Sequence, residues 1–568
     1  MNKFKSILGK KGKILIISLS LVILSLGVFS FKNPAFEITR NLDIFISLFR
    51  EVHTLYVDGA EPEELINSSI EGMLESLDPY TTYIPAEDVD DFKFMTTGKY
   101  GGIGALIRKA GEYTIISEPY EGFPAQENDL RAGDTLVSIN GVNTKGKSIS
   151  EVSQLLKGTP NTEVVLKLKR IGEESLITKT FKREQVSIPN VPYYGLLDNY
   201  VGYIILGNFM KNAGKDVKDA YLDLIDKGAT SVILDLRSNP GGLLAEAVNV
   251  ANLWVPKNQE IVSTRGKVQQ WDKTYKTKYN PVDTTMPVVV LVNRASASAS
   301  EIVAGALQDL DRAVVIGQKT FGKGLVQTTR PLSYDAHLKI TTAKYYIPSG
   351  RCIQALDYAH RNEDGSVGYI PDSLISEFKT NNGRSVFDGG GIEPDIKIQS
   401  DGPGNITVAA FTQNHIFNFA TEFASKNPSI AEANLFEISD EIYSDFKTYL
   451  ADKEFDYNTE SSEQLKELIN TTKLEGYYEK IENELNALEE HLHGDLEKDL
   501  NTFKPEIKEL LRDEIVSRYY FQKGRIIAGI HDDPEIIKAV EILNDNEAML
   551  SILNGSYDGE TIFAFNYY

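Results

Sequence analysis

Apolar residues in the middle of the chain follow two alternating patterns, which indicates strands that alternate with helices. Near-continuous apolar runs are typical of strands in a parallel sheet, because helices cover both of its faces. Such runs occupy residues 201–206, 231–236, 287–292 and 313–317. Helical spacing of apolar residues occupies residues 216–227, 243–253 and 298–307. The pattern predicts an α/β core at 185–398, with a further strand at 338–347 and a polar surface loop at 359–388.

Helical periodicity also marks both ends of the chain. Residues 36–56 and 63–77 each carry an apolar face, and Leu77-Asp78-Pro79 ends the second helix. The same periodicity recurs near the C-terminus, for example at 416–423 and 474–492. We therefore predict N-terminal helices within residues 33–97 and an α-helical C-terminal extension at 399–568.

Residues 98–184 combine short strands, glycine-rich turns and one helix. A strand at 105–108 follows the sequence GGIG, a helix is expected at 149–156, and a strand at 163–170. This pattern predicts a small separate domain inserted before the α/β core.

The N-terminal segment, residues 1–32, has the pattern of a membrane anchor or signal. Residues 14–31 carry no charge, a length close to that which spans a bilayer. Five lysines precede this run, which predicts a cytoplasmic N-terminus with the remainder on the extracytoplasmic (periplasmic) side. The run is longer than the apolar part of a usual signal peptide and lacks an Ala-x-Ala end. We expect an uncleaved anchor, with a cleaved signal and a soluble periplasmic form as second choice.

Charge and composition exclude several classes of partner and cofactor. The net charge is −22, which argues against nucleic acid. Residues 401–568 hold 14 Lys and Arg against 34 Asp and Glu, so the C-terminal extension carries nearly the whole excess. Cys352 is the only cysteine, which excludes an intrachain disulfide. The sequence has no HExxH, no CxxC and no convincing acidic cluster, so we expect no metal and no cofactor.

The serine-rich stretch NRASASASE, residues 293–301, is the strongest candidate for chemistry. It joins a strand to a helix through small residues, which suits a serine nucleophile and the backbone N–H groups of an oxyanion hole. A serine needs a base, and neither His337 nor His360 has the setting of a triad. Lys323, flanked by glycines in TFGKG, is the alternative. We expect burial to lower its pKa, so that the neutral amine can accept the serine proton.

Together, SASASE and TFGKGLVQ resemble the carboxyl-terminal processing (tail-specific) proteases, which are PDZ-containing serine peptidases with a Ser/Lys dyad. The resemblance extends over roughly residues 37–398. It selects Ser298 as the nucleophile, because Ser298 lies 25 residues before Lys323. It also implies that Gln327 orients the lysine, and that Asp309 is a possible supporting residue. The implied fold of the α/β core is crotonase-like.

The turn Asn-Pro-Gly-Gly at 239–242 directly follows the predicted strand 231–236. In the resembling family, the equivalent turn gives one backbone N–H to the oxyanion hole. The resemblance therefore implies Gly241 or Gly242 as one donor, with Ala299 as the second. One such donor is worth about 3–4 kcal/mol in the transition state.

Residues 98–184 resemble a PDZ domain, chiefly through LRAGDTLVSING at 130–141. Such a domain adds an extended peptide to the edge of its sheet, and a glycine loop captures the terminal carboxylate. The resemblance makes Gly102, Ile103 and Gly104 the candidates for peptide binding. Leu155 or Leu156 could line the pocket for the last side chain.

The resemblance implies a serine endopeptidase that recognises protein C-termini through its PDZ domain and cleaves with the Ser/Lys dyad. The alternative from a different class is a catalytically silent PDZ scaffold or holdase. A third class, a crotonase-like acyl-CoA enzyme, is disfavoured by the PDZ module and the glycine-flanked lysine. Expected partners are substrate C-termini, the membrane through the anchor, and a possible second copy through the N-terminal helices.

Overall fold

The computed structural model describes residues 34–362, 364–399, 402–453, 455, 457, 460–492, 496–557 and 561–563. It divides into two compact units, residues 1–83 and 84–568. The first unit contains α2 (Pro34–Leu55) and α3 (Pro62–Glu75), which confirms the two predicted N-terminal helices. The predicted anchor at 14–31 lies outside the described residues. Among the helices of the described residues, none has the length and apolar character needed to cross a bilayer.

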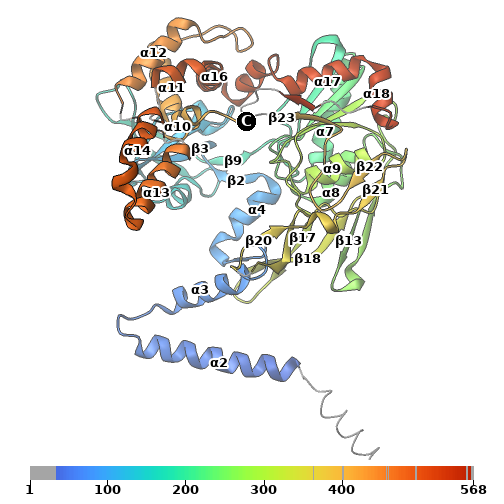
Figure 1. The fold of residues 1–568 in the computed structure, drawn as a ribbon, viewed down its shortest axis with the longest axis horizontal. Coiled ribbons are helices and arrows are strands. Elements are labelled where there is room, and N and C mark those ends of the chain that lie inside the picture. The colour runs from blue at the N-terminus through green and yellow to red at the C-terminus, as the bar shows by residue number, and fades with distance from the viewer. Residues whose placement is uncertain are drawn as a thin grey trace, which may run out of the picture. The chain divides into compact units, whose positions relative to one another are not determined.

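The second unit is built on a seven-stranded sheet with the order β10-β11-β12-β15-β16-β23-β24 (Figure 1). β10 (Tyr193–Leu196) is antiparallel to its neighbour, and the pairs that follow are parallel. The parallel strands are β11 (Val201–Ile205), β12 (Ser231–Asp235), β15 (Val288–Val292), β16 (Val314–Gly317), β23 (Ile396–Gln399) and β24 (Thr561–Phe563). The predicted α/β core is therefore confirmed, including its four apolar strands.

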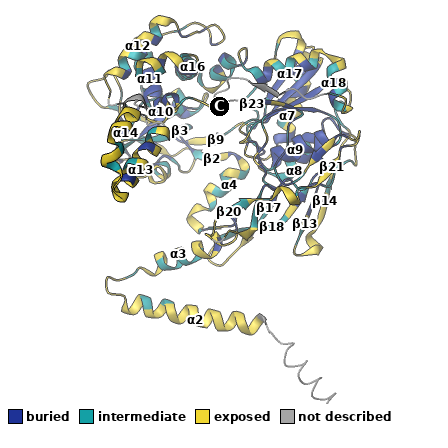
Figure 2. Ribbon diagram, in the orientation of Figure 1, coloured by how far each residue is buried: buried dark blue, intermediate teal, exposed yellow. Residues whose placement is uncertain are grey.

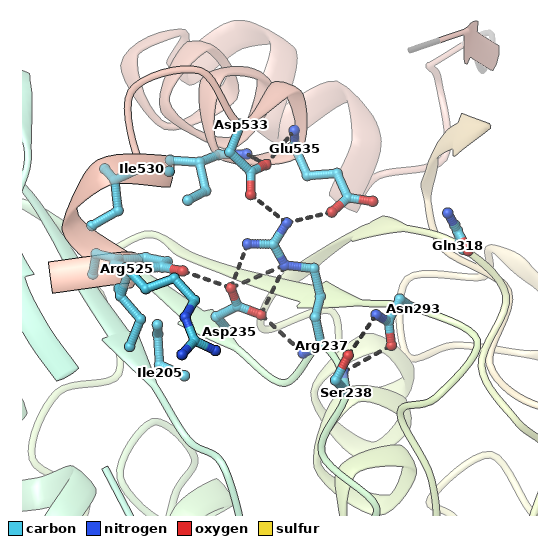
Figure 3. A pocket seen from close by; sticks show the side chains of 14 residues that line it. Ile205, Asp235, Arg237, Ser238, Asn293, Gln318, Arg525, Ile530, Asp533 and Glu535 are labelled. Atoms are coloured by element: carbon cyan, nitrogen blue, oxygen red, sulfur yellow. Dashed lines mark hydrogen bonds and ion pairs between the residues drawn. The ribbon is translucent and has the colours of Figure 1, made fainter. Parts of the chain in front are cut away.

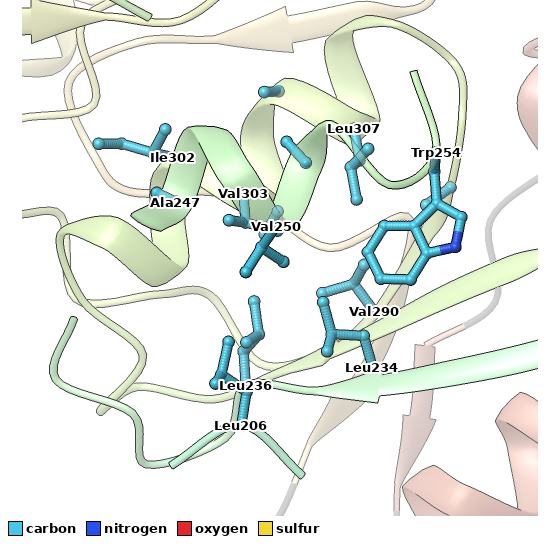
Figure 4. Packing of buried hydrophobic residues seen from close by; sticks show 14 of the residues in the cluster. Leu206, Leu234, Leu236, Ala247, Val250, Trp254, Val290, Ile302, Val303 and Leu307 are labelled. Carbon is cyan, nitrogen blue, oxygen red and sulfur yellow. The ribbon is translucent and has the colours of Figure 1, made fainter. Parts of the chain in front are cut away.

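Side chains of the sheet alternate between two apolar layers, as the period of a strand requires. Leu234 and Val290 face the layer formed with α7 (Ala213–Asp226), α8 (Leu244–Ala251) and α9 (Ala299–Asp309). Figure 4 shows this layer, where Trp254 lies beside both strand residues. Ile233 and Val289 face the opposite layer, formed with α17 (Pro534–Asn544) and α18 (Asn546–Leu553). The end of the acidic C-terminal extension thus covers one face of the core sheet.

A second, antiparallel sheet carries the segment that contains Lys323. β17 (Leu325–Pro331) pairs with β18 (His337–Tyr346), which pairs with β13 (Glu260–Gly266), and β14 (Lys273–Lys276) follows. The polar stretch 359–388, expected as a surface loop, instead forms two short antiparallel pairs. These pairs join β19 (Leu356–Arg361) with β20 (Val367–Tyr369), and β21 (Glu377–Lys379) with β22 (Ser385–Phe387). Strands this short hold too few alternating positions to be distinguished from a polar loop in the sequence.

The predicted small domain has a sheet in the order β3-β4-β5-β7-β8, with β6 beside β5. Its strands are β3 (Ala105–Ala110), β4 (Tyr113–Pro119), β5 (Thr135–Ile139), β6 (Val142–Asn143), β7 (Glu163–Lys169) and β8 (Ile177–Lys182). α5 (Pro124–Glu127) and α6 (Ile149–Leu156) complete it, and β2 (Lys99–Gly102) pairs with β9 (Glu184–Ser187) at its base. α6 begins where predicted because Ser148 and Glu151 form a capping box. β3 lies at the edge of this sheet.

Seven helices in the described residues form most of the C-terminal extension. They are α10 (Asn405–Thr412), α11 (His415–Lys426), α12 (Asp440–Ala451), α13 (Glu460–Glu475), α14 (Tyr478–Leu492), α15 (Leu496–Thr502) and α16 (Lys504–Gly529). Residues of α10, α11, α12, α15 and α16 form an apolar core of their own around Phe419, Phe446 and Ile515. α16 is interrupted at Phe521, which has φ 55°. The helices predicted at 416–423 and 474–492 are confirmed, the second with its start moved to Tyr478.

Figure 2 shows that α9 and α2 differ strongly in how far their residues are buried. α9 is dark blue along its length, since every residue from Ala299 to Asp309 is buried. α2 is mostly yellow, and its apolar face is exposed in the described structure. The helix that follows the serine-rich turn is thus held on all sides, which gives that turn a rigid base.

Glu535, in the first turn of α17, is a buried carboxyl close to the acidic side chains of Asp533 and Asp235. Burial raises its pKa to about 7; the charges of Asp533 and Asp235 add to this rise, and Arg237 opposes it. A carboxyl whose pKa is raised by folding stabilises the protein while it is protonated. That contribution is complete below the unfolded pKa of about 4.5 and is lost as the pH rises through about 7.

We therefore expect the free energy of unfolding of wild type, relative to Glu535→Gln, to fall by about 3 kcal/mol between pH 4.5 and pH 8. Chemical denaturation of both proteins across this range measures the difference. Comparing the two proteins cancels other titrating groups, such as His415, whose pKa burial lowers. A difference that stays constant with pH would contradict the assignment.

Candidate active site

The structure separates the three serines of the turn before α9. Ser296 and Ser300 are fully buried, and each hydroxyl donates to a backbone carbonyl. Ser296 Oγ donates to Leu236 O (2.8 Å), and Ser300 Oγ donates to Asn239 O (2.9 Å). Ser298 is only half-buried and lines a pocket. Of the three hydroxyls, that of Ser298 is the one in a position to meet a ligand.

Ser298 has an unusual backbone conformation. Its φ of 55° and ψ of −110° lie outside the regions that a residue with a side chain prefers. Such a conformation costs on the order of 1–3 kcal/mol and persists only where the surroundings enforce it. It places Ser298 at the sharp junction between β15 and α9, where Ser298 lines the pocket. A strained serine at a strand-to-helix turn is the geometry of a nucleophile elbow.

Glu301 is the group that enforces this conformation. It is fully buried in the first turn of α9 and accepts four hydrogen bonds. Its Oε2 accepts from the backbone N–H groups of Ser298 (2.8 Å) and Lys323 (2.9 Å). Its Oε1 accepts from Thr320 Oγ1 (2.6 Å) and from the N–H of Gly322 (2.7 Å). One carboxylate oxygen therefore binds the backbones of the predicted nucleophile and the predicted base together.

Burial raises the pKa of Glu301, and its four hydrogen bonds oppose that rise. Four donors that point at two oxygens match the acceptor capacity of an ionised carboxylate. The arrangement is sensitive to any change of the side chain, because each donor would be left buried without a partner.

Tyr345, from β18, is a second link between the two segments. Its hydroxyl donates to Lys323 O (2.6 Å) and lies 3.1 Å from Ser298 O. The ring is fully buried, and burial raises the pKa of the hydroxyl far above its ordinary value. Tyr345 thus remains a neutral hydrogen-bond donor that ties the turn before α9 to the turn before β17.

Ser298 and Lys323 line the same pocket, which has a volume of about 630 Å³. Gln327 also lines it, and its amide nitrogen donates to Thr341 Oγ1 (3.1 Å) across β17 and β18. Much of the remaining wall is apolar: Phe92, Phe94, Met95, Ile188, Met210, Leu243, Leu244, Ile302 and Leu325. The pocket can therefore accept an extended chain with apolar side chains beside the serine.

The Asn-Pro-Gly-Gly turn at 239–242, which follows β12 and is called the glycine turn below, packs directly on the serine turn, which is the serine-rich turn between β15 and α9. A Cβ at Gly241 would lie 2.7 Å from Ala297 O and 2.9 Å from both Ala299 N and Ser298 Cβ, so only glycine fits there. Gly241 N–H already donates to Asn239 Oδ1 (2.8 Å). Within the described part of the chain, the N–H groups of Gly242 and Ala299 donate to no backbone acceptor. Of the two glycines that the sequence left open, the geometry thus favours Gly242 as the free donor.

Asp309 does not line this pocket. It is buried at the end of α9, where it accepts from Arg351 Nη2 (2.8 Å) and from the N–H of Ser349 (2.9 Å). Burial raises the pKa of Asp309, and the charge of Arg351 opposes the rise. The structure therefore presents Asp309 as half of a buried ion pair rather than as a neighbour of the serine.

We expect Asp309→Asn to lower the free energy of unfolding by about 3–5 kcal/mol, because Arg351 would remain buried without its partner charge. The activity per folded molecule should stay near that of wild type. Denaturant unfolding and active-site titration separate the two effects. Asp309→Leu combined with Arg351→Met should recover much of the stability; a loss of turnover in fully folded Asp309→Asn would instead support a catalytic role.

The predicted peptide-binding loop lies beside the open edge of β3. Gly102, the last residue of β2, and Ile103 and Gly104, which lead into β3, are buried, and α6 contacts β3. Tyr100 lies against the loop; burial raises the pKa of its hydroxyl to about 12, opposed by hydrogen bonds from the backbones of Gly104 and Ala105. Leu156 belongs to the core of this domain, which leaves Leu155, half-buried, as the more accessible of the two leucines.

Sequence reasoning did not identify Glu301 or Tyr345 as parts of the site. The sequence does contain a pattern that points to Glu301: it lies three residues after Ser298 at the helix start, which is the spacing of a capping box. No sequence pattern points to Tyr345, because it contacts Ser298 from β18, 47 residues further along the chain.

Comparison with known proteins agrees with these parts. Residues 200–359 match the model of peptidase family S41, residues 115–170 match a PDZ domain, and residues 406–543 match "Probable PDZ-protease, C-terminal helical domain". The carboxy-terminal-processing protease of Bartonella bacilliformis is 35% identical over 365 residues, which cover 64% of this chain and 80% of the relative. A probable CtpA-like serine protease of Staphylococcus aureus is 35% identical over 315 residues, which cover 55% of this chain and 62% of the relative.

Among solved structures, the photosystem II D1 C-terminal processing protease is similar with 30% identity and a TM-score of 0.32, covering 55% of this chain and 89% of its own. The family matches, together with the pocket, define a class: a protease that carries a PDZ domain and a C-terminal helical domain. The chain belongs to the carboxy-terminal-processing proteases of peptidase family S41.

Proposed function

We propose that this protein is a serine endopeptidase in which Ser298 is the nucleophile and Lys323 is its general base. The observation that carries the proposal is that both line one pocket, with Ser298 in a strained turn at the start of α9. Neutral Lys323 accepts the proton of the Ser298 hydroxyl as its oxygen attacks the scissile carbonyl. The resulting ammonium then protonates the leaving amine. Gln327, on the same wall, orients the lysine.

The developing oxyanion is bound by the N–H groups of Ala299 and Gly242. Gly241 allows the close approach of the two turns, because a side chain there would collide with Ser298. Hydrolysis of the acyl-enzyme repeats the same steps with water as the nucleophile.

Substrates are recognised by their C-terminal ends in the PDZ domain. An extended peptide would add to the free edge of β3, and the N–H groups at Gly102, Ile103 and Gly104 would bind its carboxylate. Residues 14–31 would anchor the protein in the membrane, with the protease on the extracytoplasmic side, as the basic flank indicates.

The proposal is tested with the full chain in detergent and an unfolded reporter protein that ends in apolar residues. Wild type should cleave it, and a fluorophosphonate probe should label Ser298, as mapped by mass spectrometry. The same reporter with a C-terminal carboxamide should be cleaved more slowly. Reporter binding without cleavage or labelling would instead favour the alternative, a catalytically silent PDZ scaffold.

The carboxylate loop gives a separate test of C-terminal recognition. Gly104 has φ +75°, and a Cβ there would lie 2.4 Å from Phe123 Cβ. We expect Gly104→Ala to weaken binding of a peptide with a free C-terminus by about tenfold or more, equivalent to about 1.4 kcal/mol. Gly111→Ala is the matched control, because Gly111 also has a positive φ but its Cβ would meet nothing within 4 Å. Equal affinities of the two variants in fluorescence anisotropy would contradict the assignment.

A further inference from the structure

Arg237 connects the C-terminal extension to the catalytic sheet (Figure 3). Its Nη1 donates to Asp533 Oδ2 (2.6 Å) and Glu535 Oε2 (2.5 Å), both at the start of α17. Its Nε and Nη2 donate to Asp235 at the end of β12. All four side chains are at least 86% buried, since their exposed fractions are 14% or less. The carboxyl groups come from positions almost 300 residues apart in the chain.

Arg237 is also the first residue of the segment that leads into the glycine turn. Ser238, with φ 56°, donates its N–H to Asn293 Oδ1 (2.9 Å), at the start of the serine turn. Asn239 O accepts from the N–H of Ala297 (3.0 Å) and from Ser300 Oγ (2.9 Å). Asn293 Nδ2 also donates to Ser238 Oγ (3.1 Å), so four hydrogen bonds join the segment that Arg237 begins to the serine turn and the start of α9. A displacement of Arg237 would be transmitted to both turns of the pocket.

The position of α17 is set independently of these charges. Ile536, Ala539 and Ile542 pack against the core sheet in the layer that contains Ile233 and Val289. This packing places the N-terminus of α17 at the carboxyl ends of the strands, next to Arg237. Asp533 caps the helix as well, since its Oδ1 accepts from the N–H groups of Glu535 (2.9 Å) and Ile536 (3.0 Å). The carboxylate that holds Arg237 is thus fixed by the helix start.

We propose that α17 holds the glycine turn in its catalytic conformation through Arg237, which makes Asp533, Glu535 and Arg237 positioning residues for the peptidase. The catalytic part of this inference rests on the proposed function. The acidic extension is then a component of the protease rather than an appendage. The ion-pair cluster, which is costly to bury, serves to define one arrangement of the turn.

The test uses the full chain with Asp533→Asn, alone and combined with Glu535→Gln, and with Arg237→Lys. Asparagine is also a good N-cap residue, so α17 should still form. Glu541→Gln is the matched control, because Glu541 lies on the same helix, is largely exposed and pairs with Lys538. Hydrogen exchange of the 236–243 segment reports on the turn without any need for activity. Its N–H groups at Ser238, Asn239 and Gly241 are hydrogen-bonded in the structure.

We expect the double variant and Arg237→Lys to exchange these amides at least about fivefold faster than wild type and Glu541→Gln. We expect kcat for the reporter at pH 8 to fall about tenfold to a hundredfold with KM unchanged. Unchanged exchange would overturn the inference, whether or not the protein cleaves. Faster exchange with an unchanged kcat in an active wild type would overturn the catalytic role. If wild type neither cleaves nor labels, the proposed function fails, and exchange alone decides whether α17 holds the turn.

Discussion

Ser298→Ala is expected to lower the rate of reporter cleavage by at least about 10⁴-fold, since a nucleophile and its base act as a unit. Lys323→Ala should have a similar effect, because lysine removes the serine proton. The double variant should be little worse than either single variant, as losses within one catalytic unit are not additive. Initial rates with saturating reporter, together with fluorophosphonate labelling, measure these effects.

Ser296→Ala and Ser300→Ala are the matched controls. Both hydroxyls are buried and bonded to backbone carbonyls, so their loss should reduce stability by about 1–2 kcal/mol and leave turnover within about tenfold of wild type. If Ser298→Ala still cleaved while Ser296→Ala or Ser300→Ala did not, the assignment of the nucleophile would be wrong.

Because the lysine must be neutral to accept the serine proton, the cleavage rate of wild type should also rise with pH. A flat pH profile of the cleavage rate from about pH 5 to 10 would argue against a lysine base.

Glu301→Gln is expected to produce the second largest loss, about 10²- to 10³-fold in kcat. The carboxylate holds the backbones of Ser298 and Lys323 through a single oxygen, and the glutamine amide would turn a donor toward other donors. A shift of about 1 Å in either backbone would disturb the geometry of attack. The free energy of unfolding should fall by about 3 kcal/mol, from the donors left without a partner.

Asp309→Asn is the control that separates these two effects. Asp309 is a buried carboxylate at the other end of α9, so its loss should reduce stability without a comparable loss of turnover. Kinetic constants and unfolding curves of both variants make the comparison. Glu301→Gln with wild-type kcat, or the same loss of kcat in both variants, would show that Glu301 does not position the dyad.

Residues 399–568 gave the clearest difference between expectation and structure. Their charge and helical periodicity indicated a separate acidic helical region. α10–α12, α15 and α16 do form a core of their own, but α17 and α18 cover one face of the catalytic sheet and bring Asp533 to Arg237. No local pattern marks this change, because an amphipathic helix has the same period whichever surface it covers.

Short-range features of this protein were determined by its sequence. The apolar runs identified β11, β12, β15 and β16, since strands buried on both faces leave a continuous signal. The helical periods identified α2, α6 and α9, and the Ser/Ala turn with the glycine-flanked lysine marked residues 293–301 and Lys323 as candidates for chemistry. These signals lie within stretches of up to about 25 residues, where composition and period are directly visible.

Contacts between distant segments were decided only by the tertiary structure. They include the exposure of Ser298 among the three serines and the hydrogen bonds that Glu301 accepts from the backbones of Ser298 and Lys323. They also include the hydrogen bond from Tyr345 to Lys323 O, the ion pair of Asp309 with Arg351, and the packing of α17 on the core sheet. Each depends on which faces pack together and which buried polar groups then find partners. Packing and hydrogen-bond satisfaction are properties of the assembled chain, so a pattern read along the sequence does not contain them.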